Sequence, residues 1–398
     1  MAKRMIAAVL TALAILLPMM RVGAAAPPIE VDAPAAILIE QSTGEILYEK
    51  NAHEALPPAS VTKVMTLLLV MEALEDGRIS WEDTVTASET AAAKGGSQVY
   101  LEAGEQMSMD EMLKSVVVSS ANDCAAALAE HIAGSEDAFV AMMNERAAEL
   151  GMKDTHFVNC TGLDDGPNAA SHRTSCHDIA VMSRQLLQHE AILQYTTIWM
   201  DSVRNGQFGL SNTNKLVRFY PGATGLKTGF TSAAGYCLSA SACREGVSFI
   251  AVVMNCETSD QRFSSAKALL DYGFANYTLV NPQPGDALQP VPVTLGRETS
   301  VQPVLQEERG ILTAKGDAAS AETVVELAES VEAPVTAGQQ IGTLTVKSGE
   351  TVLAEIPLVA VEAVERLTWS DAAWKILRAV FFGDPAYNTG GFGHAGDS

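Results

Sequence analysis

Residues 56–63 read Leu-Pro-Pro-Ala-Ser-Val-Thr-Lys and lead directly into an apolar run at 61–74. Paired prolines before such a run, and Gly77 after it, are typical of the two ends of a helix. The stretch therefore predicts a helix that begins at or near Ser60. Because residues three apart on a helix share a face, the Lys63 amine is expected beside the Ser60 hydroxyl.

This pairing has the chemistry of a nucleophile and its base. A serine hydroxyl is a poor nucleophile until a base takes its proton. A lysine can take that proton only if burial or a nearby cation lowers the lysine pKa. Backbone N–H groups at the start of the helix would also face a developing oxyanion. By itself, however, the spacing more often marks a capping serine and a surface lysine, since short motifs match by chance.

A second short motif, Ser120-Ala121-Asn122, interrupts a helical pattern at 109–132. The Ser120 hydroxyl can relay a proton to a leaving group, and the Asn122 amide can hold a substrate backbone. The alternative is a polar break or cap between two helices, where serine and asparagine are favoured.

A third motif, Lys227-Thr228-Gly229, precedes β-rich runs at 236–242 and 247–255. A lysine and a hydroxyl on a strand can bind a substrate carboxylate, and the glycine lets a substrate backbone approach closely. The alternative is a turn that leads into the next strand.

Alternation, turn residues and helical periodicity predict the other elements. Strands are expected at 35–40 and 45–48, and helices at 135–150, 178–187 and 260–275. After residue 278 the chain is rich in Val, Thr, Pro and Glu, which predicts a separate small β domain. Its expected strands lie at 301–305, 324–327, 340–346 and 351–357.

The three motifs occur in the order S-x-x-K, S-x-N and K-T-G, which is the signature of class A β-lactamases and penicillin-binding proteins. From residue 29 to 277 the sequence resembles the low-molecular-mass D-alanyl-D-alanine carboxypeptidases, a serine peptidase family. The segments that carry the resemblance are 56–63, Asn-Cys-Thr-Gly-Leu at 159–163, GLKTGFTSAAGYCL at 225–238 and LLDYGF at 269–274.

The resemblance implies an α+β fold. A DD-peptidase/β-lactamase-like domain, with an antiparallel sheet and a helical cluster, would be followed by a small all-β domain and a C-terminal amphipathic helix. The expected boundaries are a signal peptide at 1–26, the catalytic domain at 27–277, the small β domain at 278–367, a membrane-association helix at 368–382 and a disordered tail at 383–398.

The resemblance also implies a role for each motif residue. Ser60 would form an acyl-enzyme, Lys63 would be its general base, and Ser120 would assist proton transfer. The N–H groups of Ser60 and Phe230 would form the oxyanion hole. The residues expected to bind substrate are Asn122, Lys227, Thr228, Gly229, Phe230 and Arg262. No metal or organic cofactor is expected.

The function implied is a serine D,D-carboxypeptidase that trims peptidoglycan stem pentapeptides, with β-lactams as covalent inhibitors. A serine β-lactamase is one alternative. Class A β-lactamases use a glutamate for deacylation; Glu190 superficially fits that place, but we expect a surface acid there. The other alternative is a non-catalytic wall-binding or β-lactam-sensing protein, which predicts damaged motifs, whereas all three are intact.

Composition limits the partners and the compartment. The chain has 398 residues and a formal net charge of -22, which argues against nucleic acid because phosphate binding needs clustered Lys and Arg. Lys3 and Arg4 precede an apolar run at 5–20 and small residues at 22–26. This pattern predicts a cleaved signal peptide. The alternative is an uncleaved anchor, for which the run is short. We therefore expect an exported protein at the outer side of the cytoplasmic membrane or in the cell wall.

The six cysteines leave two interpretations open. An even number in an exported chain permits disulfides, and one cross-strand pair of Cys237 with Cys256 is an option. The other is that they are buried thiols that pack as small hydrophobes.

The final helical pattern, at 366–382, has two faces. One face is expected to carry Thr368, Asp371, Lys375 and Arg378; the other is expected to carry Trp369, Ala373, Ile376, Leu377, Val380 and Phe381. Such a helix suits peripheral contact with a membrane surface. The alternative is a helix packed on the β domain.

Overall fold

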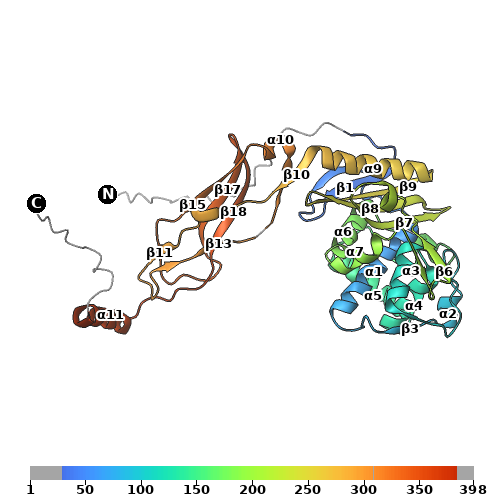
Figure 1. The fold of residues 1–398 in the computed structure, drawn as a ribbon, viewed down its shortest axis with the longest axis horizontal. Helices are drawn as coiled ribbons and strands as arrows, with labels where there is room; N and C mark the ends of the chain where they lie inside the picture. Colours follow the sequence, from blue (N-terminus) through green and yellow to red (C-terminus); the bar gives the residue numbers. More distant parts are fainter. Residues whose placement is uncertain (1–28, 308, 383–398) are drawn as a thin grey trace, which may run out of the picture.

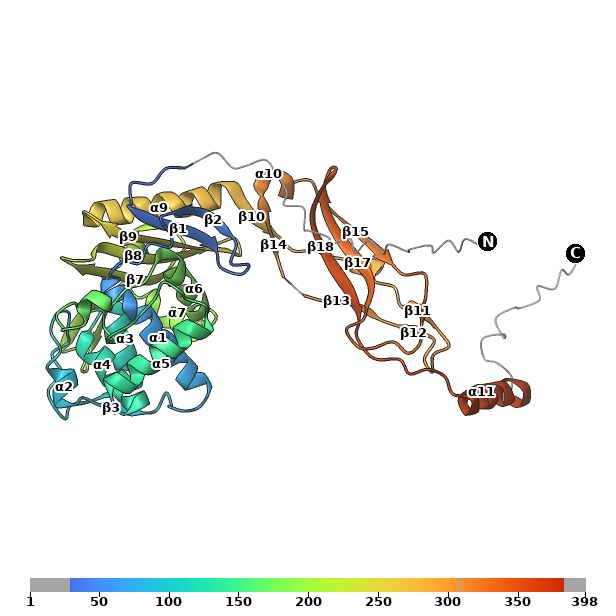
Figure 2. The same ribbon diagram turned by 180° about the vertical axis from the view of Figure 1, so that it is seen from behind.

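The computed structural model describes residues 29–307 and 309–382. The signal peptide expected at 1–26 and the tail expected at 383–398 lie outside the described residues. The molecule is elongated: a body of helices and sheet lies at one end, a body of strands follows, and the last described helix lies at the other end (Figure 1). Figure 2 shows the same order from behind.

One five-stranded antiparallel sheet organises the first body. Its strand order is β2-β1-β9-β8-β7, so the first strand of the chain lies beside the last strand of the body. The strands are β1 (Ala35–Glu40), β2 (Ile46–Lys50), β7 (Ala223–Thr231), β8 (Gly235–Arg244) and β9 (Val247–Cys256).

The sheet is covered on both faces, and its side chains alternate between two apolar cores. In β1, Ile37 and Ile39 belong to one core, while Ala36 and Leu38 belong to the other. Helix α9 (Ser259–Asn276) covers the second face, and a cluster of helices covers the first (Figure 1). The remaining helices of this body are α1 (Lys63–Glu75), α2 (Glu89–Ala92), α3 (Met109–Val118), α4 (Asn122–Ala133), α5 (Glu136–Glu149), α6 (Cys176–Leu186), α7 (Leu193–Thr196) and α8 (Leu216–Phe219).

Two antiparallel strand pairs and three 3₁₀ turns complete the first body. The pairs are β3 (Thr84–Thr86) with β4 (Gln106–Ser108), and β5 (Met200–Val203) with β6 (Phe208–Ser211). The turns are η1 (Ala59–Thr62), η2 (Ala169–Ser171) and η3 (Glu190–Ile192).

The helix predicted from the apolar run at 61–74 begins as the 3₁₀ turn η1 and continues as α1. Residues 63–71 of α1 are all buried. A helix that is apolar all round belongs in the interior rather than at a surface. The helical cluster therefore packs around α1, and Lys63 enters the core with it.

The predicted break within 109–132 is confirmed, because this stretch forms two helices. The Ser108 hydroxyl accepts from the Glu111 N–H at the start of α3, a favourable N-cap. Gly134, with a φ of 78°, ends α4. Between the helices Ser120 has a φ of 65°, which turns the chain sharply, and its side chain is buried.

The second body is built from strands, as the composition after residue 278 predicts. A four-stranded sheet has the order β13-β18-β17-β15, and smaller sheets pair β12-β11-β16 and β10-β14. The elements are β10 (Tyr277–Val280), η4 (Gly285–Ala287), β11 (Val291–Thr294), β12 (Ser300–Val301), β13 (Pro303–Leu305), β14 (Ile311–Ala314), α10 (Lys315–Ala318), β15 (Ala321–Leu327), β16 (Val331–Glu332), β17 (Gln340–Ser348) and β18 (Thr351–Ala360).

The last described helix is α11 (Trp369–Phe382). Thr368, expected on its polar face, instead precedes the helix: its hydroxyl and the Asp371 carboxylate cap the first turn. Asp371 also pairs with Arg297 of the second body at 3.0 Å. Trp369 is 94% exposed and Trp374 is 65% exposed. Among the described helices, none has the length and apolarity needed to cross a bilayer.

All six cysteines lie in the described part of the chain and are free thiols, and all but Cys243 are buried. The Cys237–Cys256 bond does not form. A bulge in the pairing of β8 with β9 places Cys256 opposite Tyr236. Cys237 then belongs to the core on one face of the sheet and Cys256 to the core on the other, so the two side chains point apart.

Candidate active site

Ser60 and Lys63 lie together as their spacing predicts. Ser60 lies within η1 and Lys63 is the first residue of α1. Their Oγ and Nζ atoms are 3.0 Å apart. The Ser60 side chain is thus partly exposed at this turn, whereas the Lys63 side chain is fully buried.

The Lys63 amine is held by two carbonyl groups as well as by the serine. Its Nζ is 2.5 Å from Asn122 Oδ1 and 2.8 Å from the Thr161 carbonyl oxygen. The side chain is fully buried, and burial lowers the pKa of Lys63 to about 7, although Cys160 and Asp123 oppose this shift. A large fraction of this amine is therefore neutral near pH 7.

The neutral amine has a defined orientation. It carries two N–H groups and one lone pair, and the two carbonyl oxygens accept both N–H groups. The remaining position faces Ser60 Oγ. The lone pair is thus aimed at the serine hydroxyl, as a general base requires.

The second motif lies on the other side of this amine. Ser120 is buried, and its Oγ has no hydrogen-bond partner within residues 29–307 and 309–382. Asn122 connects the start of α1 with the loop at Gly95, because its Oδ1 accepts from Lys63 and its Nδ2 donates to the Gly95 carbonyl at 2.7 Å. Both polar atoms of the Asn122 amide are thus engaged within the protein, and its expected role in holding substrate stays a prediction.

The third motif lies on β7, the edge strand next to η1. Lys227 is buried, and its Nζ donates to the Thr228 carbonyl at 2.9 Å. Burial, and then the charges of Lys63 and Arg262, hold the pKa of Lys227 well below its usual value. The Thr228 hydroxyl donates to Thr213 Oγ1 at 2.6 Å. This part of the site therefore brings three basic side chains, Lys63, Lys227 and Arg262, close together, and the contacts within residues 29–307 and 309–382 give none of them a carboxylate partner.

Gly229 lies where β7 packs against η1. A Cβ atom built on Gly229 would lie 2.7 Å from the Pro58 carbonyl oxygen and 3.1 Å from the Ser60 nitrogen. The backbone at Pro58 and Ser60 therefore approaches this glycine closely, and the expected contact of Gly229 with a substrate backbone stays a prediction. Phe230 is 53% exposed, and its ring packs on the Tyr236 ring with the two ring centroids 4.3 Å apart.

Arg262 reaches the motifs from α9, on the other face of the sheet. Its Nη1 donates to the Gly229 carbonyl at 3.1 Å and to the Cys237 carbonyl at 3.3 Å. Its guanidinium lies over the Tyr236 ring. These contacts brace the β7–β8 hairpin, and a direct role of Arg262 in carboxylate recognition stays a prediction.

Two residues that help to position the Lys63 amine were not assigned roles from the sequence. Thr161 supplies a backbone carbonyl to Lys63, and Asn159 shapes that loop by accepting from the Thr161 and Gly162 N–H groups. Both lie in the segment that carried the family resemblance. A backbone acceptor leaves no side-chain signature, so resemblance was the only available signal.

His172 also supports the nucleophile turn. Its Nδ1 accepts from the Val158 N–H at 3.1 Å, so the neutral ring donates from Nε2 to Thr62 Oγ1 at 2.7 Å. Thr62 in turn donates to the Ala59 carbonyl at 2.8 Å. Burial lowers the pKa of His172 to about 4, which keeps the ring neutral at ordinary pH.

Replacing Gly162 with alanine is expected to destabilise the turn that holds Ser60. Gly162 has a φ of +83°, and a Cβ there would lie 1.8 Å from the Ala59 carbonyl oxygen. The clash and left-handed strain should cost about 2–4 kcal/mol of unfolding free energy. Thermal unfolding measures this loss. The matched control is Gly166→Ala in the same loop, where a Cβ meets nothing within 4 Å; equal melting temperatures for the two variants would contradict the argument.

The sheet with its helical cluster, and the serine paired with a buried lysine, define a serine peptidase of the DD-peptidase/β-lactamase-like class. Comparison with known proteins names the family. Residues 21–258 match the family described as D-alanyl-D-alanine carboxypeptidase, and residues 281–366 match the C-terminal domain of penicillin-binding protein 5. The chain belongs to the D-alanyl-D-alanine carboxypeptidase family.

Individual relatives agree along most of the chain. The D-alanyl-D-alanine carboxypeptidase DacF of Bacillus subtilis is 42% identical over 341 residues, which cover 84% of this chain and 86% of the relative. DacC of Escherichia coli is 31% identical over 360 residues, covering 88% and 89%. Penicillin-binding protein 5 of Haemophilus influenzae superposes with a TM-score of 0.75 at 30% identity, covering 85% of this chain and 99% of that one. The family expected from sequence is confirmed, as is a fold class with an α+β catalytic domain followed by an all-β domain.

Proposed function

We propose that this carboxypeptidase removes the terminal D-alanine from peptidoglycan stem pentapeptides through an acyl-enzyme on Ser60. The observation that carries the proposal is the placement of the Lys63 amine. Asn122 Oδ1 and the Thr161 carbonyl accept its N–H groups, and its Nζ lies 3.0 Å from Ser60 Oγ. A base that is half neutral near pH 7 suits proton transfer at ordinary pH.

The acylation step follows from this geometry. Lys63 takes the Ser60 proton as Oγ attacks the carbonyl between the two terminal D-alanines. The N–H groups of Ser60 and Phe230 would stabilise the oxyanion. Collapse of the tetrahedral intermediate breaks the peptide bond, and the proton passes by way of the Ser120 hydroxyl to the departing D-alanine amine. Water then hydrolyses the ester, which regenerates Ser60 and releases the shortened peptide.

The terminal carboxylate of the substrate would bind beside Lys227 and Thr228. A buried lysine whose pKa is lowered gains from an anionic partner, because the partner favours the charged amine. Substrate binding would then be accompanied by protonation of Lys227. The Gly229 carbonyl accepts from Arg262, which ties this part of β7 to α9.

The test of the proposed function is incubation of the purified protein with a stem pentapeptide, followed by an assay for free D-alanine. Release of one D-alanine per peptide would support it. Intact pentapeptide after prolonged incubation with protein that still binds penicillin would overturn it.

We also propose that β-lactams form a slowly hydrolysed acyl-enzyme with this chain. Penicillin-binding protein D2 of Listeria monocytogenes, 31% identical over a match that covers 62% of this chain, has been solved in ampicillin-bound and cefotaxime-bound forms. Glu190 is exposed in η3, as expected of a surface acid. The alternative function of a serine β-lactamase is therefore not favoured. Rapid repeated turnover of penicillin would contradict this proposal.

Export by the segment at 1–26, and peripheral contact of α11 with the outer face of the cytoplasmic membrane, complete the proposal. Its support is the exposure of Trp369 and Trp374 on a helix that lies at the far end from the active site, since aromatic side chains favour the membrane interface.

A double variant, Trp369→Ala with Trp374→Ala, is expected to lose most of the protein's affinity for lipid vesicles, because it removes both exposed tryptophans of α11 and leaves Phe381 as an exposed aromatic ring. Co-sedimentation with vesicles measures the bound fraction. The control is Tyr100→Ala, which removes an aromatic ring that is 69% exposed on the catalytic body. Equal sedimentation of both variants and the unaltered protein would count against anchoring through α11.

A further inference from the structure

The two carbonyl groups that hold the Lys63 amine are positioned by two different loops, although Asn122 itself is the first residue of α4. One is the Asn122 side chain, whose amide is fixed by the carbonyl of Gly95. The other is the Thr161 carbonyl, in the loop that begins at Asn159. The aim of the lysine lone pair at Ser60 depends on both loops being in place at once.

One ion pair ties these loops together. Lys94 precedes Gly95 directly, and its Nζ pairs with Glu136 Oε2. Glu136 Oε1 accepts from both the backbone N–H and the thiol of Cys160, each at 3.2 Å. The Glu136 carboxylate therefore connects Lys94, next to Gly95, with Cys160, next to Thr161.

The pair is ionised at neutral pH. Burial would raise the pKa of Glu136, but the hydrogen bond and charge of Lys94 outweigh it and lower this pKa. Burial would lower the pKa of Lys94, but the hydrogen bond and charge of Glu136 raise it overall. Glu136 is also the first residue of α5, where the helix dipole favours a negative charge.

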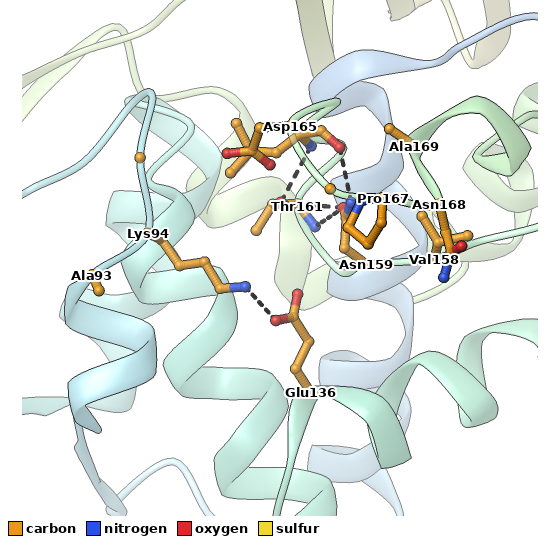
Figure 3. A pocket seen from close by; sticks show the side chains of 13 residues that line it. Ala93, Lys94, Glu136, Val158, Asn159, Thr161, Asp165, Pro167, Asn168 and Ala169 are labelled. Carbon is orange, nitrogen blue, oxygen red and sulfur yellow. Dashed lines mark hydrogen bonds and ion pairs between the residues drawn. The ribbon is translucent and has the colours of Figure 1, made fainter.

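The pair lines an open cavity of about 280 Å³ beside the site. Figure 3 shows Lys94 and Glu136 joined across it, with Asn159 and Thr161 on the neighbouring loop. The two side chains are 20% and 15% exposed. Truncating either one enlarges a space that solvent already reaches, so the substitution leaves no sealed void in the core.

We propose that Lys94 and Glu136 act as positioning residues that hold the two acceptors of Lys63 in register and thereby aim its amine at Ser60. Neither side chain contacts the reacting serine in the described contacts, so their effect passes through Asn122 and Thr161. This inference rests on the proposed function, because it assigns a task to Lys63 as base.

The test is the rate constant for acylation by a fluorescent penicillin, measured from about pH 6 to about pH 9. Glu136→Ala is expected to lower this rate by about ten-fold or more, because small misplacements of a catalytic group are costly. It should also move the midpoint of the pH profile upward. The reason is that a loosened loop admits water to Lys63, and burial is the main cause of its lowered pKa.

The matched control is Glu72→Ala. It removes one of the two carboxylate partners of Arg146 on α5. The side chains of Arg146 and Glu72 are 24% and 18% exposed, and this ion pair does not touch the loops around Lys63. Its acylation rate and pH midpoint should equal those of the unaltered protein. Lys94→Met tests the same connection from the other side and serves if Glu136→Ala does not fold, as judged by circular dichroism.

The outcomes separate the two proposals. If the unaltered protein is not acylated at all, the proposed function fails. If the unaltered protein is acylated, but Glu136→Ala and Lys94→Met match Glu72→Ala in both rate and pH midpoint, the positioning role is overturned. A slower rate with an upward-shifted midpoint in these two variants alone supports it.

Discussion

A Ser60→Ala variant is expected to lose covalent labelling by fluorescent penicillin and to lose D-alanine release from a pentapeptide. The change removes Ser60 Oγ, which lies 3.0 Å from the Lys63 amine. Removing the nucleophile of a serine peptidase costs about 10⁴-fold or more in turnover. Because Ser60 is only partly buried, losing its hydroxyl should leave folding intact.

The measurement is labelling followed by gel fluorescence, with D-alanine assayed in parallel. The control is Ser264→Ala, since this serine lies on α9 and its hydroxyl makes only an exposed contact within that helix. Equal labelling of Ser60→Ala and the unaltered protein would show that another nucleophile reacts.

Acylation is expected to speed up as the pH rises through about 7, the pKa to which burial lowers Lys63. Only the neutral amine can accept the Ser60 proton, so the rate should fall by about ten-fold for each pH unit below the midpoint. If Lys63 acted instead as a cation that stabilises charge, the rate would fall as the pH rises through the same range. The sign of the pH dependence therefore decides between the two roles.

Lys63→Arg sharpens the test, because an arginine keeps the positive charge but does not lose its proton at any accessible pH. It is expected to be almost inactive across the whole range. Lys267→Met, a change at an exposed position of α9, is the control for loss of a lysine charge. Substantial acylation by Lys63→Arg would contradict the role of base.

Local patterns predicted the elements that lie close together in sequence. The nucleophile helix, the break around Ser120 and the β8–β9 hairpin could be derived because their signals fall within a few residues. The pairing of β1 with β9 could not, since no turn joins these strands. In the second body, strands of two to four residues are too short to show an alternating pattern.

The same limit applies to the site. Three motifs gave Ser60, Lys63 and Lys227, but the acceptor at Thr161 is a backbone atom 98 residues from Lys63. The close approach of Gly229 to the Pro58 carbonyl could not be predicted from the sequence either. Such packing depends on how two distant segments meet, which no single segment encodes.

The distribution of the six thiols offers an experimental handle. Five are buried in the two cores, while Cys243 is exposed near the turn between β8 and β9. Thiol-reactive dyes should therefore attach at one place on the folded protein without any engineered cysteine. A donor fixed at Cys243 and an acceptor in lipid would report, by energy transfer, how far above a bilayer the catalytic body stands.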